Sequence, residues 1–150
     1  MPMNKELEGK TYDPVTYEVG REKIREFAQA VGETAGIYHD PEAAREAGHP
    51  EQVAPLTFPT VLHLKSGPQV IMDPDLGLNY ALVVHGTQEF EYRRPIYAGD
   101  VLTATPKIAE IAARGPHEFL TIETTIADGA GEEVCIARAV LISRGTAVQG

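Results

Sequence analysis

The stretch Phe90-Glu-Tyr-Arg-Arg-Pro-Ile-Tyr-Ala-Gly-Asp100 decides the fold of this chain, because one strand ends within it and another begins directly after it. Phe90 and Tyr92 share one face of an alternating segment and two glutamates share the other, a pattern typical of a half-buried strand. Pro95 has no amide hydrogen and cannot continue a central strand. The Gly-Asp pair predicts a turn, so we expect the next strand to begin at Val101.

The same alternation extends over the second half of the chain. It predicts a short strand near Tyr17 and four long strands, at residues 83–93, 101–111, 118–127 and 134–143. Glycine-containing turns join the long strands, among them Ala127-Asp-Gly-Ala-Gly131, which is a strong hairpin signal. Strands joined by short turns are mostly antiparallel neighbours, so we expect an antiparallel sheet.

Helical patterns occupy the first half of the chain. Apolar residues recur at helical spacing over residues 21–31, and Gly32 stands in the usual place for a residue just past a helix end. A second, short helix is predicted with Asp40 as its N-cap and Pro41 at its first position, ending at Gly48. The segment between these two helices is expected to be a loop.

A third helix is predicted to begin near Thr57 or Phe58, with Thr57 as its side-chain cap and Pro59 in its first turn. It continues through Lys65 and ends or kinks at Gly67-Pro68, since proline disfavours helical geometry at the preceding residue. The helix is mostly apolar, as is typical of a buried helix. A strand, then helices, then a run of strands predicts an α+β fold with the helices on one face of the sheet.

Composition limits the classes of protein that this chain can represent. Its 150 residues fit one domain, residues 1–150. The formal net charge of -9 disfavours a nucleic-acid partner, because phosphate binding needs a clustered Lys and Arg surface. Cys135 is the single cysteine, so we expect a reducing, cytoplasmic location. No apolar window reaches the length of a signal-peptide core or a membrane span, so we expect no membrane association.

Three stretches together carry a family resemblance: residues 90–100, Ala54-Pro-Leu-Thr-Phe58 and Asp40-Pro-Glu-Ala-Ala44. With them the chain resembles the MaoC-like (FAS1-type N-terminal) dehydratases over roughly residues 9–143. Within that family it looks most like the short proteins related to the non-catalytic first subunit of actinobacterial (3R)-hydroxyacyl carrier-protein dehydratase. The resemblance implies a hot-dog fold, in which an antiparallel sheet wraps around a central helix. It also implies a homodimer or heterodimer whose sheets join edge to edge.

The resemblance also marks candidate catalytic residues. Active members of the family carry Asp-x-Asn-Pro-x-His, followed by Asp-Pro-Glu-x-Ala, at the loop into a short helix. Alignment on the second motif places Tyr38 where the catalytic histidine stands and Glu33 where the aspartate stands. His39 lies one position past the histidine site and would reach the pocket if the loop register shifts. The alternative interpretation of His39 is an exposed loop histidine that flanks the helix capped by Asp40.

The chemistry of the reaction explains why a tyrosine at the position of the catalytic histidine matters. Dehydration of a (3R)-3-hydroxyacyl thioester removes a proton from C2 and protonates the leaving C3 hydroxyl. A histidine with a pKa near ~6.5 suits both steps, whereas tyrosine, with a pKa near ~10, is a poor base. A chain with Tyr38 at the histidine position therefore resembles the subunit that lines the acyl channel while its partner keeps the catalytic pair.

Two further places are candidate substrate-binding sites. Free backbone amides at the start of the third helix can bind a thioester carbonyl, with Pro55, Thr57 and Phe58 around them. His85 and Gly86 lie within a strand, where a glycine marks either close approach of a ligand or a bulge. The other histidines show no metal-ligand spacing and no glycine-rich nucleotide loop is present, so we expect no metal and no cofactor.

The leading hypothesis is a subunit of a (3R)-hydroxyacyl-thioester dehydratase or enoyl hydratase in fatty-acid metabolism, a hydro-lyase acting on acyl-CoA or acyl-carrier-protein thioesters. An acidic carrier protein would need a basic spot, for which Arg93-Arg94, with Lys65 or Arg45, is the candidate. Three alternatives stay open. They are an independent hydratase with a divergent Glu33 and His39 site, a thioesterase, and an acyl-ligand binding protein without catalysis. A thioesterase would need a carboxylate on or near the third helix, and Glu51, the nearest one upstream, lies too early in the pattern.

Overall fold

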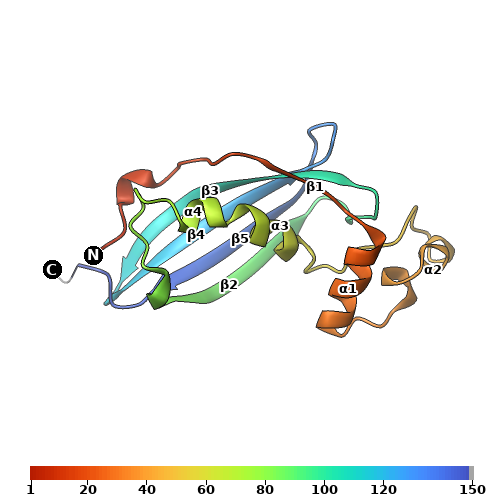
Figure 1. Cartoon of the computed structure of the whole chain (residues 1–150), viewed down its shortest axis with the longest axis horizontal. Coiled ribbons are helices and arrows are strands. Elements are labelled where there is room, and N and C mark those ends of the chain that lie inside the picture. Colours follow the sequence, from red (N-terminus) through yellow and green to blue (C-terminus); the bar gives the residue numbers. More distant parts are fainter. Residues whose placement is uncertain (149–150) are drawn as a thin grey trace.

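Five antiparallel strands form one sheet in the computed structural model, which describes residues 1–148 (Figure 1). The strand order is β1-β3-β4-β5-β2, so β1 and β2 are the two edges. The predicted strands are all confirmed, although β3 runs three residues further than its pattern suggested. Their bounds are β1 Val15–Glu18, β2 Val83–Tyr92, β3 Val101–Arg114, β4 His117–Ala127 and β5 Glu133–Ser143.

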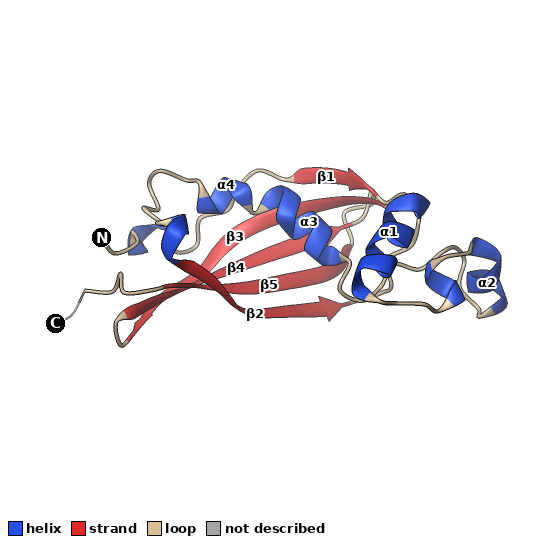
Figure 2. Ribbon diagram, turned by 60° about the horizontal axis from the view of Figure 1, so that its bottom comes forward, coloured by secondary structure: helices blue, strands red, loops and turns tan. Residues whose placement is uncertain are grey.

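The helices lie on one face of the sheet and past one of its ends (Figures 1 and 2). The two local signals of the first half are confirmed: Gly32 ends α1 with a left-handed φ of 78°, and the side chain of Asp40 accepts a hydrogen bond from the amide of Glu42. The α-helices are α1 Arg21–Val31, α2 Pro41–Glu46, α3 Pro59–Ser66 and α4 Pro68–Ile71, and the short 3-10 helices are η1 Lys5–Leu7, η2 Gly36–Tyr38 and η3 Tyr80–Leu82.

The start of α3 differs from the prediction. Phe58 occupies the N-cap position with helical angles, φ -54° and ψ -31°, and no side chain caps the helix. Thr57 is therefore not the cap. The reason is that the chain already turns at residues 55–58, where the amide of Phe58 donates to the carbonyl of Pro55 at 2.9 Å. The helix thus continues from a preformed turn, and its first amides bond to carbonyls of that turn.

The expected kink between α3 and α4 is confirmed at Gly67. Its amide donates to the carbonyl of His63 at 2.7 Å, and α4 begins at the following proline. A Cβ at Gly67 would lie 2.7 Å from the same carbonyl oxygen, so only glycine fits this bend. The bend lets α3 and α4 together follow the concave face of the sheet (Figure 2).

α3 is the central helix, but the sheet covers only part of it. Phe58, Val61 and Leu62 are buried against the sheet, whereas Leu64 on the other side of the helix is 68% exposed. The expectation of a buried helix is therefore confirmed for the side that faces the sheet and wrong for the other side, which remains open towards η3 and the β2 edge. None of the helices in residues 1–148 is long and apolar enough to cross a membrane.

Candidate functional site

The loop that holds Glu33, Tyr38 and His39 lies with α1 and α2 beyond the end of the sheet (Figure 2). The ring Nε2 of His39 lies 2.7 Å from the backbone carbonyl oxygen of Glu33, so the ring donates to the backbone and not to the carboxylate. Arg25 donates to the backbone carbonyl of His39 at 3.2 Å. Glu33 and His39 are neighbours, but they do not form an acid–base pair.

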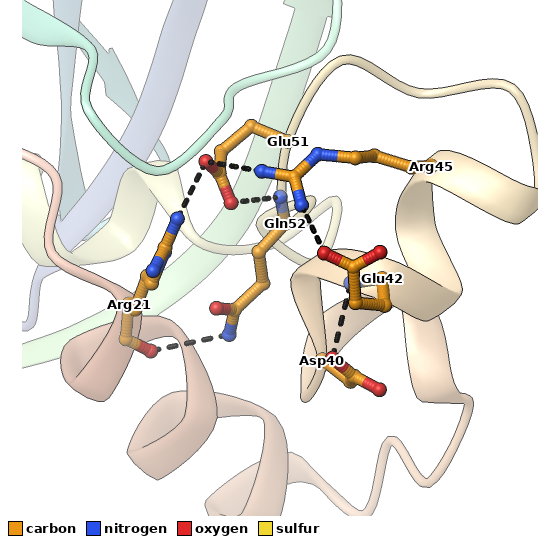
Figure 3. A network of polar contacts seen from close by, with 6 residues as sticks. All are labelled: Arg21, Asp40, Glu42, Arg45, Glu51 and Gln52. Carbon is orange, nitrogen blue, oxygen red and sulfur yellow. Dashed lines mark hydrogen bonds and ion pairs between the residues drawn. The ribbon is translucent and has the colours of Figure 1, made fainter.

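Gln52 fixes this loop against the segment that leads into α3. Its side chain is fully buried, and its amide donates to the carbonyl of Tyr38 at 2.7 Å. The same amide donates to the carbonyl of Arg21 at 3.2 Å (Figure 3). The amide of Val53 adds a bond to the carbonyl of Ile37 at 3.0 Å. The backbone of Tyr38 is therefore held in place, which is a structural role that the sequence pattern did not indicate.

Glu51, the thioesterase candidate, is part of an ion-pair network beside this loop (Figure 3). Its carboxylate lies 2.8 Å from the guanidinium of Arg21 and 3.6 Å from that of Arg45. The hydrogen bond from Arg21, followed by one from the amide of Gln52, lowers the pKa of Glu51. A carboxylate that is held ionised by two arginines is a weak base for activating water.

The turn before α3 offers two backbone amides to solvent. Leu56 and Thr57 are exposed, and their amides have no hydrogen-bond acceptor within residues 1–148. The carbonyl of Leu56 accepts a bond from the hydroxyl of Tyr92 at 2.7 Å, which anchors the turn to the sheet. Burial raises the pKa of that hydroxyl, so Tyr92 stays protonated and remains a donor. The amides are thus presented from a fixed turn.

Pro55 and Phe58, predicted to surround a substrate, lie beneath this turn. Both are buried, and Phe58 has no exposed surface. Its ring packs edge-on against Phe27 with a centroid separation of 5.5 Å and lies 6.5 Å from the ring of Tyr17. Phe58 therefore supports the turn from the core, and Thr57 is the member of the predicted set that faces outward.

A cavity of about 350 Å³ lies between α3, α4, η3 and the β2 side of the sheet. Much of its wall is apolar and comes from Leu64, Ile71, Ile122 and Leu141. The residues with polar side-chain atoms are Thr60, His63, Tyr80, His85 and Gln88. His85 was predicted from the sequence, but His63 and Gln88 were not, because the helix and the strands that line the cavity come together only in the folded chain.

Two polar atoms in this wall have no partner. The Nδ1 atom of His63 and the Nε2 atom of Gln88 are buried without a hydrogen bond to any described residue. Burial, and to a lesser degree the neighbouring His85, lowers the pKa of His63, so this imidazole is neutral at pH 7. Helical spacing of Thr60 and His63, three residues apart, is the sequence signal that could have indicated a shared face.

Gly86 lies at a β-bulge, where the register of β2 with β5 shifts between His85 and Thr87. It lines a separate depression on the sheet and not the cavity, and a Cβ there would come within 3.0 Å of Ile142. The glycine is therefore required by the sheet itself. The bulge also brings His85 and Gln88 onto the same wall, although strict alternation would place them on opposite faces.

The basic residues proposed for carrier docking are paired within the chain. Arg93 bonds Glu91 at 2.9 Å and Glu133 at 2.8 Å. Arg94 bonds Asp100 at 2.8 Å, and the Nζ of Lys65 lies 5.4 Å from the centre of the Tyr17 ring. Within the described part of the chain, no cluster of three or more metal-ligating side chains is found.

Comparisons with known proteins agree with this architecture. The family model described as "FAS1-like, dehydratase domain region" matches residues 6–137. A UPF0336 protein from Saccharopolyspora erythraea is 47% identical over 148 residues, which is 98% of this chain and 95% of that relative.

Two solved structures extend the likeness to the fold. A crystal structure of the C-terminally truncated HadBC (3R-hydroxyacyl-ACP dehydratase) complex from Mycobacterium tuberculosis has a TM-score of 0.82 and 31% identity, covering 91% of this chain and 96% of that chain. A MaoC-like dehydratase has a TM-score of 0.86 and 29% identity, covering 93% of this chain and 43% of that one. The family model matches most of the chain, and the antiparallel sheet curves around α3 as in these structures. This chain therefore belongs to the MaoC-like, FAS1-like dehydratase family and has the hot-dog fold.

Proposed function

We propose that this chain is the acyl-binding subunit of a (3R)-hydroxyacyl-thioester dehydratase or enoyl-thioester hydratase, and that a hot-dog partner supplies the catalytic aspartate and histidine. The observation that carries the proposal is a contrast within the chain. An apolar-walled cavity of about 350 Å³ is present, whereas His39 is bonded to a backbone carbonyl and no acid–base pair forms in the loop.

The cavity suits an acyl chain because its wall is mostly hydrocarbon. Each buried methylene contributes about 0.8 kcal/mol of transfer free energy, so several carbons would provide useful affinity. The exposed amides of Leu56 and Thr57 precede Thr60, the cavity residue nearest the start of α3. Two amide donors at that position suit a thioester carbonyl, with the acyl chain extending along α3 into the cavity.

A partner subunit fits the open side of the cavity. Strand β2 is hydrogen-bonded on one side only, to β5. Leu64 and Tyr80, which line the cavity, are 68% and 69% exposed, a large apolar area for a surface without a partner. A hot-dog subunit paired with the β2 edge would cover both side chains and close the cavity. The similar HadBC dehydratase is a complex, which supports this arrangement.

Hydration of crotonyl-CoA and crotonyl carrier protein tests the proposal directly. We expect little turnover by the purified chain, and turnover at least 100-fold higher when a hot-dog subunit with an intact Asp-x-Asn-Pro-x-His motif is added. The same partner with its histidine replaced by alanine is the control. Full turnover by this chain alone would contradict the proposal and favour an independent hydratase.

The cavity also favours a second candidate, a protein that binds acyl ligands without catalysis. This function needs the apolar wall of the cavity, but no partner. Tight binding of an acyl thioester, combined with no turnover in any mixture with motif-bearing subunits, would support it over the dehydratase.

A further inference from the structure

The cavity contains two unsatisfied hydrogen-bonding groups. Four buried side-chain nitrogen or oxygen atoms lack a partner in residues 1–148, and two of the four, His63 Nδ1 and Gln88 Nε2, belong to residues that line this cavity. Leaving such a group unpaired costs roughly 1–3 kcal/mol, and each of the two atoms has less than 1 Å² of accessible surface as it stands, so a side-chain rotation that lets it meet a ligand or water is favoured. The two come from different elements, α3 and β2.

The identity of the two atoms limits what they can bind. The side-chain nitrogen of Gln88 is a donor only, so its partner must be an acceptor. The neutral ring of His63 has one donor and one acceptor nitrogen. A ligand hydroxyl can accept from Gln88 and donate to His63, and a carbonyl oxygen can accept from both. A methylene group would leave both atoms unpaired.

We propose that this cavity selects an acyl group that carries a hydroxyl or carbonyl oxygen part-way along its chain, and that the oxygen lies between His63 and Gln88. The inference deepens the proposed function and rests on it. His63 lies four residues after Pro59, the first residue of α3. At 1.5 Å per residue this is about 6 Å along the helix axis, so the oxygen lies several carbons beyond the thioester carbonyl.

The bulge at Gly86 is the second structural observation in favour of this site. Without the register shift between His85 and Thr87, Gln88 and His85 would point to opposite faces of the sheet. The bulge gives the cavity two polar side chains from a single edge strand. The hydroxyl of Thr60, one turn before His63, lines the same cavity. Polar side chains from α3 and from β2 therefore line one cavity whose wall is otherwise mostly apolar.

Binding of matched acyl-CoA thioesters tests the proposal. The probes are decanoyl-CoA and a series of decanoyl-CoAs with one hydroxyl or keto group at a carbon from the fifth to the ninth. Calorimetric titration of the full chain, alone and with its partner subunit, gives the Kd values. We expect at least one oxygenated chain to bind about tenfold more tightly than decanoyl-CoA, because only that chain pairs both polar atoms.

Two variants test whether His63 and Gln88 cause the preference for an oxygenated acyl chain. Gln88→Met keeps the length of the side chain and removes its donor, and His63→Leu removes both ring nitrogens. Each is expected to reduce the tenfold preference to about twofold or less, measured as the ratio of the Kd values for the oxygenated and plain chains in the same variant. Gln69→Met is the matched control, because Gln69 lies outside the cavity and donates to the carbonyl of Asp13. It is expected to keep the full preference.

The outcomes separate this inference from the proposed function. Equal Kd values for plain and oxygenated chains would overturn the inference and leave the acyl-binding function intact, since water would then satisfy the two atoms. No measurable binding of any thioester, alone or with a partner, would overturn both. If a variant does not fold, the ratio of Kd values for plain and oxygenated chains, measured on the unmodified protein, still tests the inference.

Discussion

The ring of His39 donates a hydrogen bond to the backbone carbonyl of Glu33, 2.7 Å away, and leaves the Glu33 carboxylate in solvent. These two residues stand at or next to the family's catalytic positions, yet the histidine ring contacts the backbone of Glu33 and not its carboxylate. We therefore expect His39→Ala to leave crotonyl-thioester turnover of the mixed complex within about twofold. A positioned acid or base is worth ~10²–10⁴-fold, so a loss of that size would identify His39 as catalytic. Glu33→Gln, which keeps the backbone bond, is the companion variant.

Gln52→Leu is expected to destabilise the chain strongly. The fully buried amide of Gln52 donates to the carbonyls of Tyr38 and Arg21, and leucine would remove both bonds. The Arg21 carbonyl keeps its place in the first turn of α1, but the Tyr38 carbonyl loses its donor, and a buried unsatisfied group costs roughly 1–3 kcal/mol, so we expect a loss of about 1–3 kcal/mol in urea unfolding. Gln69→Leu removes a more exposed amide contact and is expected to cost less than about 1 kcal/mol. Equal losses in the two variants would contradict the role of Gln52.

Gly67→Ala is expected to disturb the bend between α3 and α4. The added Cβ would lie 2.7 Å from the carbonyl oxygen of His63, so the backbone on one side must move. Forced overpacking of this kind typically costs about 1–3 kcal/mol. Gly129→Ala is the control, because a Cβ there has no neighbour within 4 Å. Urea unfolding measures both variants, and an unchanged midpoint for Gly67→Ala would show that the bend tolerates a side chain.

Asp73 is expected to make stability depend on acidic pH. Its carboxylate accepts bonds from Lys10 at 2.6 Å and from the Tyr12 hydroxyl at 2.7 Å, and these contacts lower its pKa from 3.8 to about 2. A carboxyl group with a lowered folded-state pKa stabilises the fold above its unfolded pKa, and this contribution disappears as the pH falls through the folded value.

The Asp73→Asn variant tests this dependence. Between about pH 3.8 and pH 2, the unmodified chain should lose more unfolding free energy than the variant, which lacks the titrating group. Urea midpoints measured across this range give the comparison. Parallel pH profiles for the two proteins would show that the Lys10 and Tyr12 contacts do not stabilise the carboxylate.

Leu64→Glu is expected to prevent assembly with the hot-dog partner while the chain itself still folds. Leu64 is 68% exposed on the open side of α3, where the proposed partner would bury it, and burying an unpaired charge costs several kcal/mol. Sedimentation of the mixture should show separate subunits and activity should fall in parallel. Val148→Glu changes a residue that is 73% exposed at the far end of the chain and should assemble normally. Assembly of Leu64→Glu with full activity would place the partner elsewhere.

Local patterns predicted much of the fold. The structure confirms three of them: the alternation around Phe90 and Tyr92, the helical spacing that ends at Gly32, and the cap at Asp40. All three depend on residues that are close in sequence. The cap at Thr57 was wrong because a preceding turn, anchored by Tyr92 from a distant strand, supplies the first bonds of α3. That anchor has no local sequence signal.

The sequence alone thus determined the alternating strands, the helix ends and the departure from the catalytic motif at Tyr38, because these follow from side-chain spacing and residue chemistry. Only the tertiary structure decided which groups share the cavity. His63 and Gln88 are 25 positions apart, and both line it because α3 packs across the sheet and β2 shifts register at Gly86. Both features depend on contacts between segments far apart in sequence, which one-dimensional periodicity does not encode.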